Sequence, residues 1–227
     1  MTDQPNSDEL FFTRTGLDRG RVEGLVGEAL AGADDGELFL EYRQSEGLGF
    51  DDGMLKTASF DTTQGFGLRA VADEATGYAH ASELSEAAIT RAAATVKAVR
   101  SGSGGTSAAA PSGTNQALYG EENPLGEDGF EAKVKLLEDI NAYARGLDTR
   151  VRQVTASLSG EWQAVQIIRA SGQRLADIRP LVRLNVSVVV GDDNRKETGS
   201  HGSGGRYAYD LLLAPETWRD HVDEAYR

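Results

Sequence analysis

The feature that most constrains the fold of this chain is a strict alternation of side chains between residues 182 and 190. Valine or leucine occupies every even-numbered position, and the odd-numbered positions hold Arg183, Asn185, Ser187 and Val189. A period of two residues places successive side chains on opposite faces of a β-strand. The segment therefore predicts a half-buried strand, which we place in a meander of strands that runs to about residue 213.

The first part of the chain predicts a helix, several strands and a second helix. Apolar residues recur at helical spacing from Asp18 onward, and residues 37–43 then alternate between mostly apolar and charged side chains. Asp51-Asp52-Gly53 favours a tight turn between two strands, because Asp-Gly tolerates positive φ. A second helix begins at Ser85, whose hydroxyl is suited to capping the first free N–H groups.

The second part follows a similar order, with a helix at about 129–147, the meander, and a last helix that begins at Pro215. We therefore expect an α+β fold with largely antiparallel sheets, three to four helices and two helix–meander halves. Residues 101–116 read SGSGGTSAAAPSGTNQ and predict a linker. The expected parts are a flexible lead-in at 1–17, a first lobe at 18–100, the linker at 101–116, a second lobe at 117–213 and the start of a truncated helix at 214–227.

Composition excludes several classes of protein. The 36 acidic residues outnumber the 23 basic ones and give a formal net charge of −13. Phosphate backbones are bound by clustered Lys and Arg, so nucleic acid and anionic membranes are poor candidates as partners. No segment approaches the roughly 20 apolar residues of a membrane span, and the N-terminal residues are unlike a secretory signal. We expect a cytoplasmic protein.

Few residues of this chain are suited to metal chemistry. The chain has no cysteine, and none of its histidines (His80, His201 and His221) has a glutamate beside it, which excludes the HExxH and HExxxH motifs. His221 and Glu224 lie three residues apart and could face one metal from the last helix. Two ligands do not make a zinc site, so a pair of surface residues is the simpler interpretation.

A glycine-dense segment lies between residues 199 and 205. Its spacing differs from phosphate-binding motifs, so we expect a wide turn between strands. Such a turn could pair with an extended peptide through its main chain, as sheet edges do, or it could be a solvated hairpin tip. Ser200 and Ser203 lie on either side of His201 and leave a serine hydrolase open as a minor alternative.

Four blocks of sequence stand out together. They are residues 37–43, the stretch FDDGMLKTASFDTTQGFGLRAVADEATGYAHASELSE at 50–86, residues 177–186, and RKETGSHGSGGR at 195–206. In this order they resemble the TldD/PmbA family of zinc metallopeptidases, and the motif-lacking subunit type (PmbA, or TldE) is the poorer match. The resemblance implies a cytoplasmic protease whose two related subunits form a heterodimer and cleave extended or unfolded peptides inside an enclosed cavity.

The family's catalytic signature is an HExxxH motif in the C-terminal half, with a later cysteine as a further zinc ligand. This chain has neither feature, and its last helix stops without the usual capping signals. The resemblance therefore implies the N-terminal part of a protease, with zinc bound by the full-length protein and with no catalytic or metal-binding residue in this chain. We expect it to be inactive alone; the alternative is a stand-alone, non-catalytic peptide-binding or scaffold protein.

Some residues are candidates for contact with a peptide substrate. Four of them surround the glycine-dense segment, and the fifth is an arginine among apolar neighbours, where an anionic partner is common. These candidates are Arg69, Arg195, Glu197, His201 and Arg206. The expected partners are peptide or protein substrates, a PmbA/TldE-like subunit, or a second copy of the chain in a homodimer.

Overall fold

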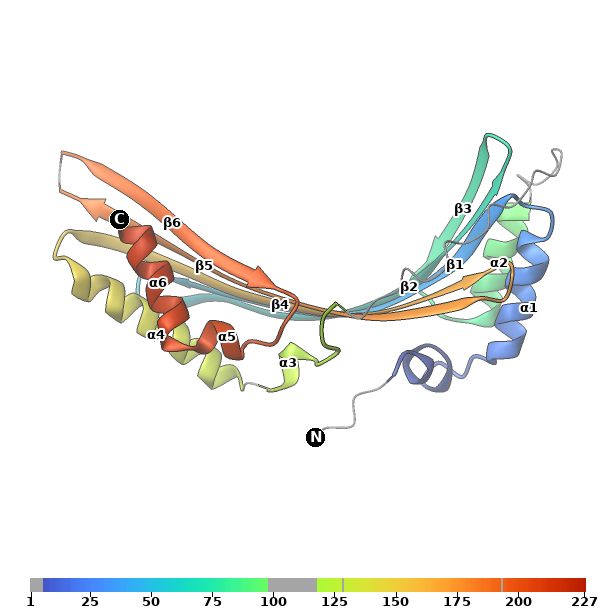
Figure 1. Cartoon of the computed structure of the whole chain (residues 1–227), viewed down its shortest axis with the longest axis horizontal. Helices are drawn as coiled ribbons and strands as arrows, with labels where there is room; N and C mark the ends of the chain where they lie inside the picture. The colour runs from blue at the N-terminus through green and yellow to red at the C-terminus, as the bar shows by residue number, and fades with distance from the viewer. Residues whose placement is uncertain (1–5, 98–117, 128, 193) are drawn as a thin grey trace. The chain divides into compact units, whose positions relative to one another are not determined.

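The structure is a computed structural model that describes residues 6–97, 118–127, 129–192 and 194–227. Its strands form a six-stranded sheet in the order β3-β2-β1-β4-β5-β6, and with the accompanying helices this confirms the predicted α+β fold (Figure 1). In chain order the elements are the π-helix η1 (Glu9–Thr13), α1 (Arg19–Leu30), β1 (Asp35–Asp51), β2 (Met54–Ala72), β3 (Ala75–Ala81), α2 (Glu86–Lys97), α3 (Pro124–Glu127), α4 (Phe130–Leu147), β4 (Val151–Arg169), β5 (Arg174–Gly191), β6 (Lys196–Gly205), α5 (Asp210–Leu213) and α6 (Pro215–Tyr226).

The chain divides into two compact units, and the four longest strands each contribute to both. Unit 1 contains Met1–Arg43, Thr62–Leu118 and Gln163–Ile178, and unit 2 contains Gln44–Asp61, Tyr119–Trp162 and Arg179–Arg227. This division differs from the predicted consecutive lobes. Strands β1, β2, β4 and β5 are 17 to 19 residues long, which at about 3.3 Å per residue is enough to serve two cores. The predicted linker at 101–116 lies outside the described residues.

Unit 1 packs α1 against α2 and α2 against β3, and Figure 1 shows the two helices side by side. Both helices begin where the sequence predicts. The Asp18 carboxylate accepts a hydrogen bond from the Arg21 N–H at 2.7 Å, and the Ser85 hydroxyl accepts one from the Ala88 N–H at 3.2 Å. These bonds satisfy N–H groups that the first turn of a helix leaves free.

The lead-in that the sequence predicts as flexible is helical from residue 7 to residue 13. Leu10, Phe11 and Phe12 are buried in unit 1. The Asp8 carboxylate accepts hydrogen bonds from Gln166 at 2.7 Å and from Arg174 at 3.2 Å. Three consecutive apolar residues match neither the helical nor the strand period, which is why the pattern did not predict this structure.

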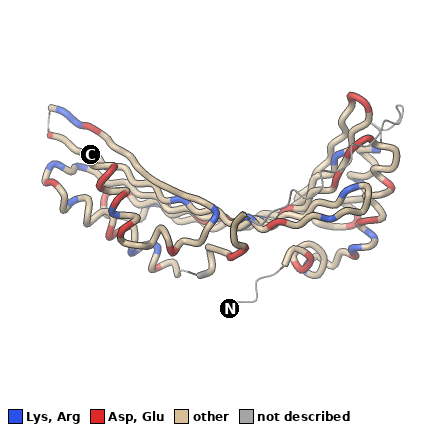
Figure 2. The backbone as a smooth tube through the Cα atoms, in the orientation of Figure 1, with Lys and Arg blue, Asp and Glu red and all other residues tan. Residues whose placement is uncertain are grey.

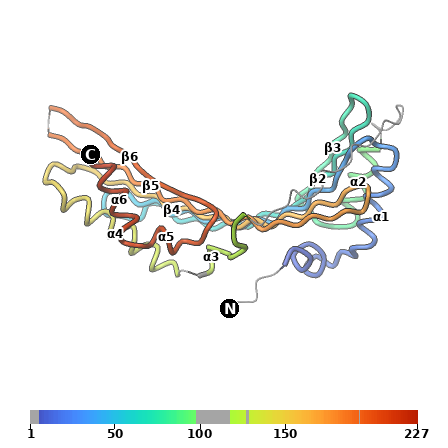
Figure 3. Tube along the Cα trace, viewed as in Figure 1, coloured from blue at the N-terminus to red at the C-terminus, as the bar shows by residue number. Residues whose placement is uncertain are grey.

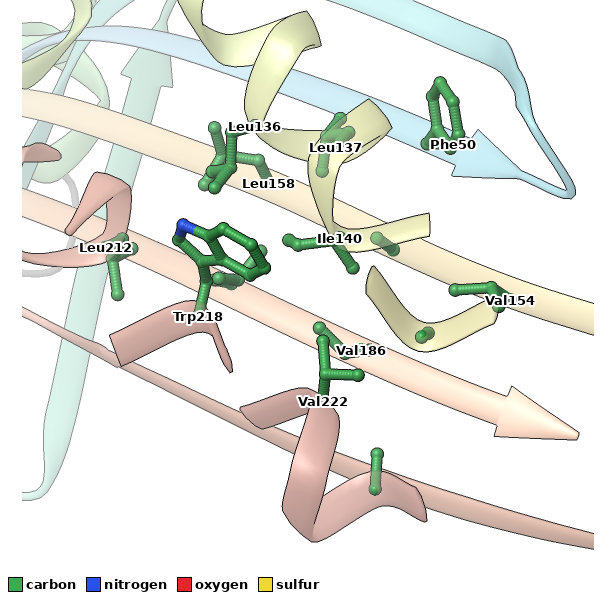
Figure 4. Packing of buried hydrophobic residues seen from close by; sticks show 14 of the residues in the cluster. Phe50, Leu136, Leu137, Ile140, Val154, Leu158, Val186, Leu212, Trp218 and Val222 are labelled. Carbon is green, nitrogen blue, oxygen red and sulfur yellow. The ribbon is translucent and has the colours of Figure 1, made fainter. Parts of the chain in front are cut away.

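The core of unit 2 lies between α4, α6 and the strands β4 and β5. Figure 4 shows Trp218 and Val222 of α6 reaching toward Ile140 of α4 and Val186 of β5. Trp218 is 6% exposed and the other three are almost fully buried. The alternation at 182–190 thus has the predicted result, because the even-numbered side chains of β5 face the helices.

The turn at the β1–β2 junction also agrees with the prediction. Asp52 and Gly53 adopt positive φ angles of 51° and 83° between the two strands. Asp and Gly tolerate this region better than other residues do.

The glycine-dense segment is a strand, which corrects the prediction of a wide turn or hairpin tip. Strand β6 pairs antiparallel with β5, from Gly191 opposite Lys196 to Val182 opposite Gly205. A side chain on Gly199 would collide with the Ala225 carbonyl of α6. The glycine is therefore needed for the close approach of this helix, which Figure 3 shows beside β6 near the C-terminus.

Charged residues of both signs are interspersed in each unit, as Figure 2 shows for the part of the chain that the structure describes. No helix in the described ranges combines the length and the apolar character needed to cross a membrane.

Candidate functional site

Two of the three histidines meet in unit 2, where α6 packs against β6. The Nδ1 atoms of His201 and His221 lie 3.0 Å apart, and the Ser203 Oγ lies 2.7 Å from the Nε2 of His221. The Asp220 carboxylate completes the group, and one ligand atom from each of Asp220 and the two histidines lies within 4.8 Å of the others. We call these four residues the histidine cluster. Its two imidazoles are 20 positions apart in the sequence.

The side-chain periods of strand β6 and helix α6 explain why these residues lie together. His201 and Ser203 are two residues apart on β6, so their side chains share one face of the strand. His221 lies three residues after Trp218 and four before Ala225, which places it on the buried stripe of α6. A polar residue on an apolar stripe was the one sequence signal that could have pointed to this site.

The environment of the cluster differs between its members. His221 is 5% exposed, whereas His201 and Asp220 are exposed. Burial lowers the pKa of His221 below its usual range, the neighbouring His201 lowers it further, and Asp220 acts in the opposite direction. The lowered pKa favours the neutral form of the ring, and a neutral imidazole has one nitrogen that can accept a proton or bind a metal.

The sequence left open that His221 and Glu224 face one metal and favoured a pair of surface residues, but His221 is buried. Glu224 instead forms an ion pair with Arg227 at 2.6 Å. In the described part of the chain, the only group of three or more potential metal ligands is that of His201, Asp220 and His221.

Three of the predicted substrate-contact residues lie near the two ends of β6. Arg195 and Glu197 form an exposed ion pair at 2.7 Å beside the β5–β6 turn. At the other end, Arg206 donates a hydrogen bond to the Pro180 carbonyl at 3.4 Å and stacks on the Tyr119 ring, 5.0 Å from its centroid. The first pair is accessible to a peptide, whereas Arg206 is held by its own chain.

Arg69 lies in unit 1 and has its anionic partners within the chain. Its Nε donates to the Glu37 Oε1 at 2.8 Å, and its Nη2 donates to Asp35 at 2.9 Å. Hydrogen bonding and charge from these carboxylates raise the pKa of Arg69. The expected anionic partner is thus supplied by the neighbouring strand β1, and a bidentate contact of this kind orients the side chain.

A cleft of about 360 Å³ opens on the strands of unit 2. Its lining includes Glu46 of β1, Ser159 of β4, Leu181 and Arg183 of β5, and Gly204 of β6. The sequence could not reveal this cleft, because its residues come from four different strands. Its lining combines an apolar side chain with charged ones.

Comparison with known proteins identifies the family. Residues 36–100 match the family model described as PmbA/TldA metallopeptidase domain 1, and residues 123–227 match the PmbA/TldA metallopeptidase central domain. A Haemophilus influenzae protein named metalloprotease TldD homolog is 39% identical over 184 residues, which are 79% of this chain and 38% of that protein. The chain belongs to the PmbA/TldD metallopeptidase family.

Other members agree with this assignment. A metalloprotease TldD homolog of Buchnera aphidicola from Acyrthosiphon pisum is 32% identical over 184 residues, again 79% of this chain and 38% of the relative. The chain thus spans about two fifths of the length of the curated PmbA/TldD proteins that it matches. The resemblance seen in the sequence blocks is confirmed.

Solved structures share the fold. The crystal structure of TldE from Thermococcus kodakarensis has a TM-score of 0.71 and 13% identity, covering 91% of this chain and 47% of that one. A protein of Bacteroides thetaiotaomicron, proposed to modulate DNA gyrase, has a TM-score of 0.73 and 12% identity over 92% of this chain and 49% of its own. At these identities the likeness establishes the fold alone.

Proposed function

We propose that this chain forms the first and central domains of a TldD-like zinc metalloprotease that cleaves extended or unfolded peptides in the cytoplasm. Within that enzyme it shapes the substrate cavity and contacts a PmbA/TldE-like partner subunit. The observation that carries the proposal is the match of two consecutive parts of the chain to domain 1 and the central domain of one metallopeptidase family.

The zinc implied by the family does not fit the residues of this chain as a hydrolytic centre. The family's donor set is HExxxH with a cysteine, and the sequence contains neither. Hydrolysis by zinc also needs a general base beside the metal-bound water. The histidine cluster offers no glutamate, and the Ser203 hydroxyl already contacts the buried imidazole. We therefore place the hydrolytic zinc in polypeptide outside this chain.

Peptide contact is supported by the surface of unit 2. The exposed Arg195–Glu197 pair provides both charges beside the β5–β6 turn, and the cleft next to Gly204 exposes the apolar Leu181 side chain. Strand β6 is the last strand in the sheet order, and sheet edges bind extended peptides by main-chain hydrogen bonds. We expect an unfolded polypeptide to bind along this surface.

A binding and cleavage experiment tests the proposal. The purified 227-residue chain is mixed with fluorescein-labelled β-casein, an unfolded polypeptide, with zinc or with EDTA. We expect saturable binding by fluorescence anisotropy and no cleavage. The double variant R195A/E197A should weaken binding several-fold, because both charges of the exposed pair are removed. Arg91→Ala is the matched control, since Arg91 is an exposed, ion-paired arginine on α2 of unit 1.

Each outcome bears on a different part of the proposal. Chelator-sensitive cleavage by the chain alone would show that the hydrolytic centre is here, and would overturn the assignment. Equal casein affinity for the wild type and R195A/E197A would show that Arg195 and Glu197 do not contact the substrate. Co-purification with a PmbA/TldE-like subunit supports the partner role, whereas casein binding combined with no such complex favours a stand-alone peptide-binding protein.

A further inference from the structure

We propose that His201, Asp220 and His221 bind a divalent transition-metal cation that clamps helix α6 to strand β6. The proposal does not rest on the proposed function, because it needs only the three side chains and their geometry. It replaces the sequence-based expectation that this chain binds no metal. That expectation treated the histidines as scattered, whereas the structure brings two of them into contact.

The separation of the two imidazoles fits a common ligand shell. Zinc–nitrogen bonds are about 2.0–2.1 Å long, so two ligands at a right angle lie about 2.9 Å apart and at a tetrahedral angle about 3.3 Å apart. The observed distance of 3.0 Å between the Nδ1 atoms falls between these values. A cation could therefore take the place of the hydrogen bond between the two nitrogens, once the rings tilt so that both lone pairs point at it.

Ser203 orients the buried ligand. Its Oγ lies 2.7 Å from the Nε2 of His221. When the Nε2 carries the proton and donates it to this hydroxyl, the Nδ1 lone pair points at His201. Metal-binding histidines almost always donate their second N–H to such a partner, which sets the tautomer and the orientation of the ring.

Asp220 supplies the third ligand. Its side chain is exposed, and one of its oxygens lies within 4.8 Å of a ring nitrogen of each histidine. Rotation of this exposed side chain can bring the carboxylate to bonding distance. Two imidazoles and one carboxylate favour zinc, iron, cobalt or nickel over magnesium and calcium, which prefer shells made of oxygen ligands.

The bound cation is expected to stabilise the folded state by cross-linking two elements of unit 2. His201 lies on β6, whereas Asp220 and His221 lie on α6, so the bound cation would join two elements with bonds that the folded chain alone lacks. A ligand that binds only the folded state stabilises it in proportion to the logarithm of its concentration. Because His201 and Asp220 are exposed, the cation can reach the site without unfolding of unit 2.

The test uses the tag-free 227-residue chain, stripped with EDTA and dialysed. Zinc is titrated at pH 7.5 by isothermal titration calorimetry, and Co²⁺ is added separately to record its visible d–d absorption. We expect one cation per chain and a rise in melting temperature. His201→Ala and Asp220→Asn should abolish or strongly weaken binding, and Ser203→Ala should weaken it by about tenfold through loss of the orienting contact.

His80→Ala is the matched control. His80 is the remaining histidine, lies on β3 of unit 1 and stacks on Tyr78 with ring centroids 5.6 Å apart, so this variant should bind zinc as the wild type does. His201 and Asp220 are exposed, so their variants should keep the wild-type circular dichroism spectrum without metal. The proposal is wrong if the wild type binds no zinc, or if His201→Ala and Asp220→Asn keep wild-type affinity and the Co²⁺ spectrum.

Discussion

The helices of unit 1 and unit 2 meet their sheets with different chemistry. In unit 1 the buried faces of α1 and α2 consist of alanine, valine, leucine and isoleucine. In unit 2, α4 buries Lys133 and α6 buries His221 among their apolar residues. Unit 1 also caps both helices with side chains, whereas Gly129 and Ala214 precede α4 and α6 without a side-chain cap.

The buried Lys133 has an anionic and an aromatic partner. Its Nζ lies 2.5 Å from the Glu46 carboxylate and 4.6 Å from the centroid of the Tyr209 ring. Burying charged or polar groups costs free energy even when they are paired, so an apolar helix face is the cheaper way to fill a core. The helices of unit 1 thus pack through apolar side chains, whereas the helices of unit 2 also bury polar groups that need a further explanation, His221 first among them.

The largest predicted effect is on the buried ion pair of unit 2. Lys133→Met removes the partner of a carboxylate that is only 14% exposed, and should lower the free energy of unfolding by about 3 kcal/mol in urea denaturation. The double variant K133M/E46Q should recover most of this loss, because no unpaired charge remains.

Lys135→Met on the same helix is the control for that experiment. Lys135 is exposed and pairs with Asp139, and exposed pairs contribute less than about 1 kcal/mol. If Lys133→Met and Lys135→Met lower the free energy of unfolding equally, the buried ion pair contributes no more to stability than an exposed one, and the prediction is wrong.

A smaller effect is expected from the helix caps. Ser85→Ala should destabilise the chain by about 1 kcal/mol, because the Ala88 N–H loses its acceptor. In unit 2, Ala214→Ser should stabilise by up to about 1 kcal/mol, since Ala214 has extended φ and ψ of −61° and 126° that suit a capping serine. Thermal and urea unfolding measure both changes. Opposite signs would support the difference in helix capping between the two units, and a loss of stability in both variants would contradict it.

The smallest expected effect is a pH dependence in unit 1. The hydrogen bond from Gln166 lowers the pKa of Asp8 below 3.8; burial opposes this, and Arg174 and Arg19 lower the pKa further. A carboxylate whose pKa is depressed on folding stabilises the folded state above its unfolded pKa, and this contribution is lost as pH falls through the folded value. Stability should therefore fall more steeply below about pH 4 in the wild type than in Asp8→Asn. Identical acid unfolding curves would contradict this.

Much of the fold follows from local patterns. The helices that start after Asp18, Ser85 and Gly129 and the strand at 182–190 were predictable because caps and periodicity involve neighbours within one or two turns. The family was predictable for a similar reason, since its blocks are contiguous in the sequence. The helical turns around Phe11 were missed because the segment is held by tertiary contacts, such as the hydrogen bond from Gln166 to Asp8, which joins residues more than 150 positions apart.

Only part of the candidate site could be predicted from the sequence. His201 and Glu197 were named from the glycine-dense segment, but that segment is a strand that pairs with β5. Its glycine at 199 is explained by the packing of α6, which leaves no room for a side chain there. The helix periods, the alternation of β5, the absence of HExxxH and the types of possible metal ligand can all be read from the sequence. The contacts of His201 with His221, 20 positions apart, and of Lys133 with Glu46, 87 positions apart, became visible only in the folded chain. The physical reason is that side-chain direction follows from local backbone geometry, whereas proximity across the chain follows from how the helices and strands pack.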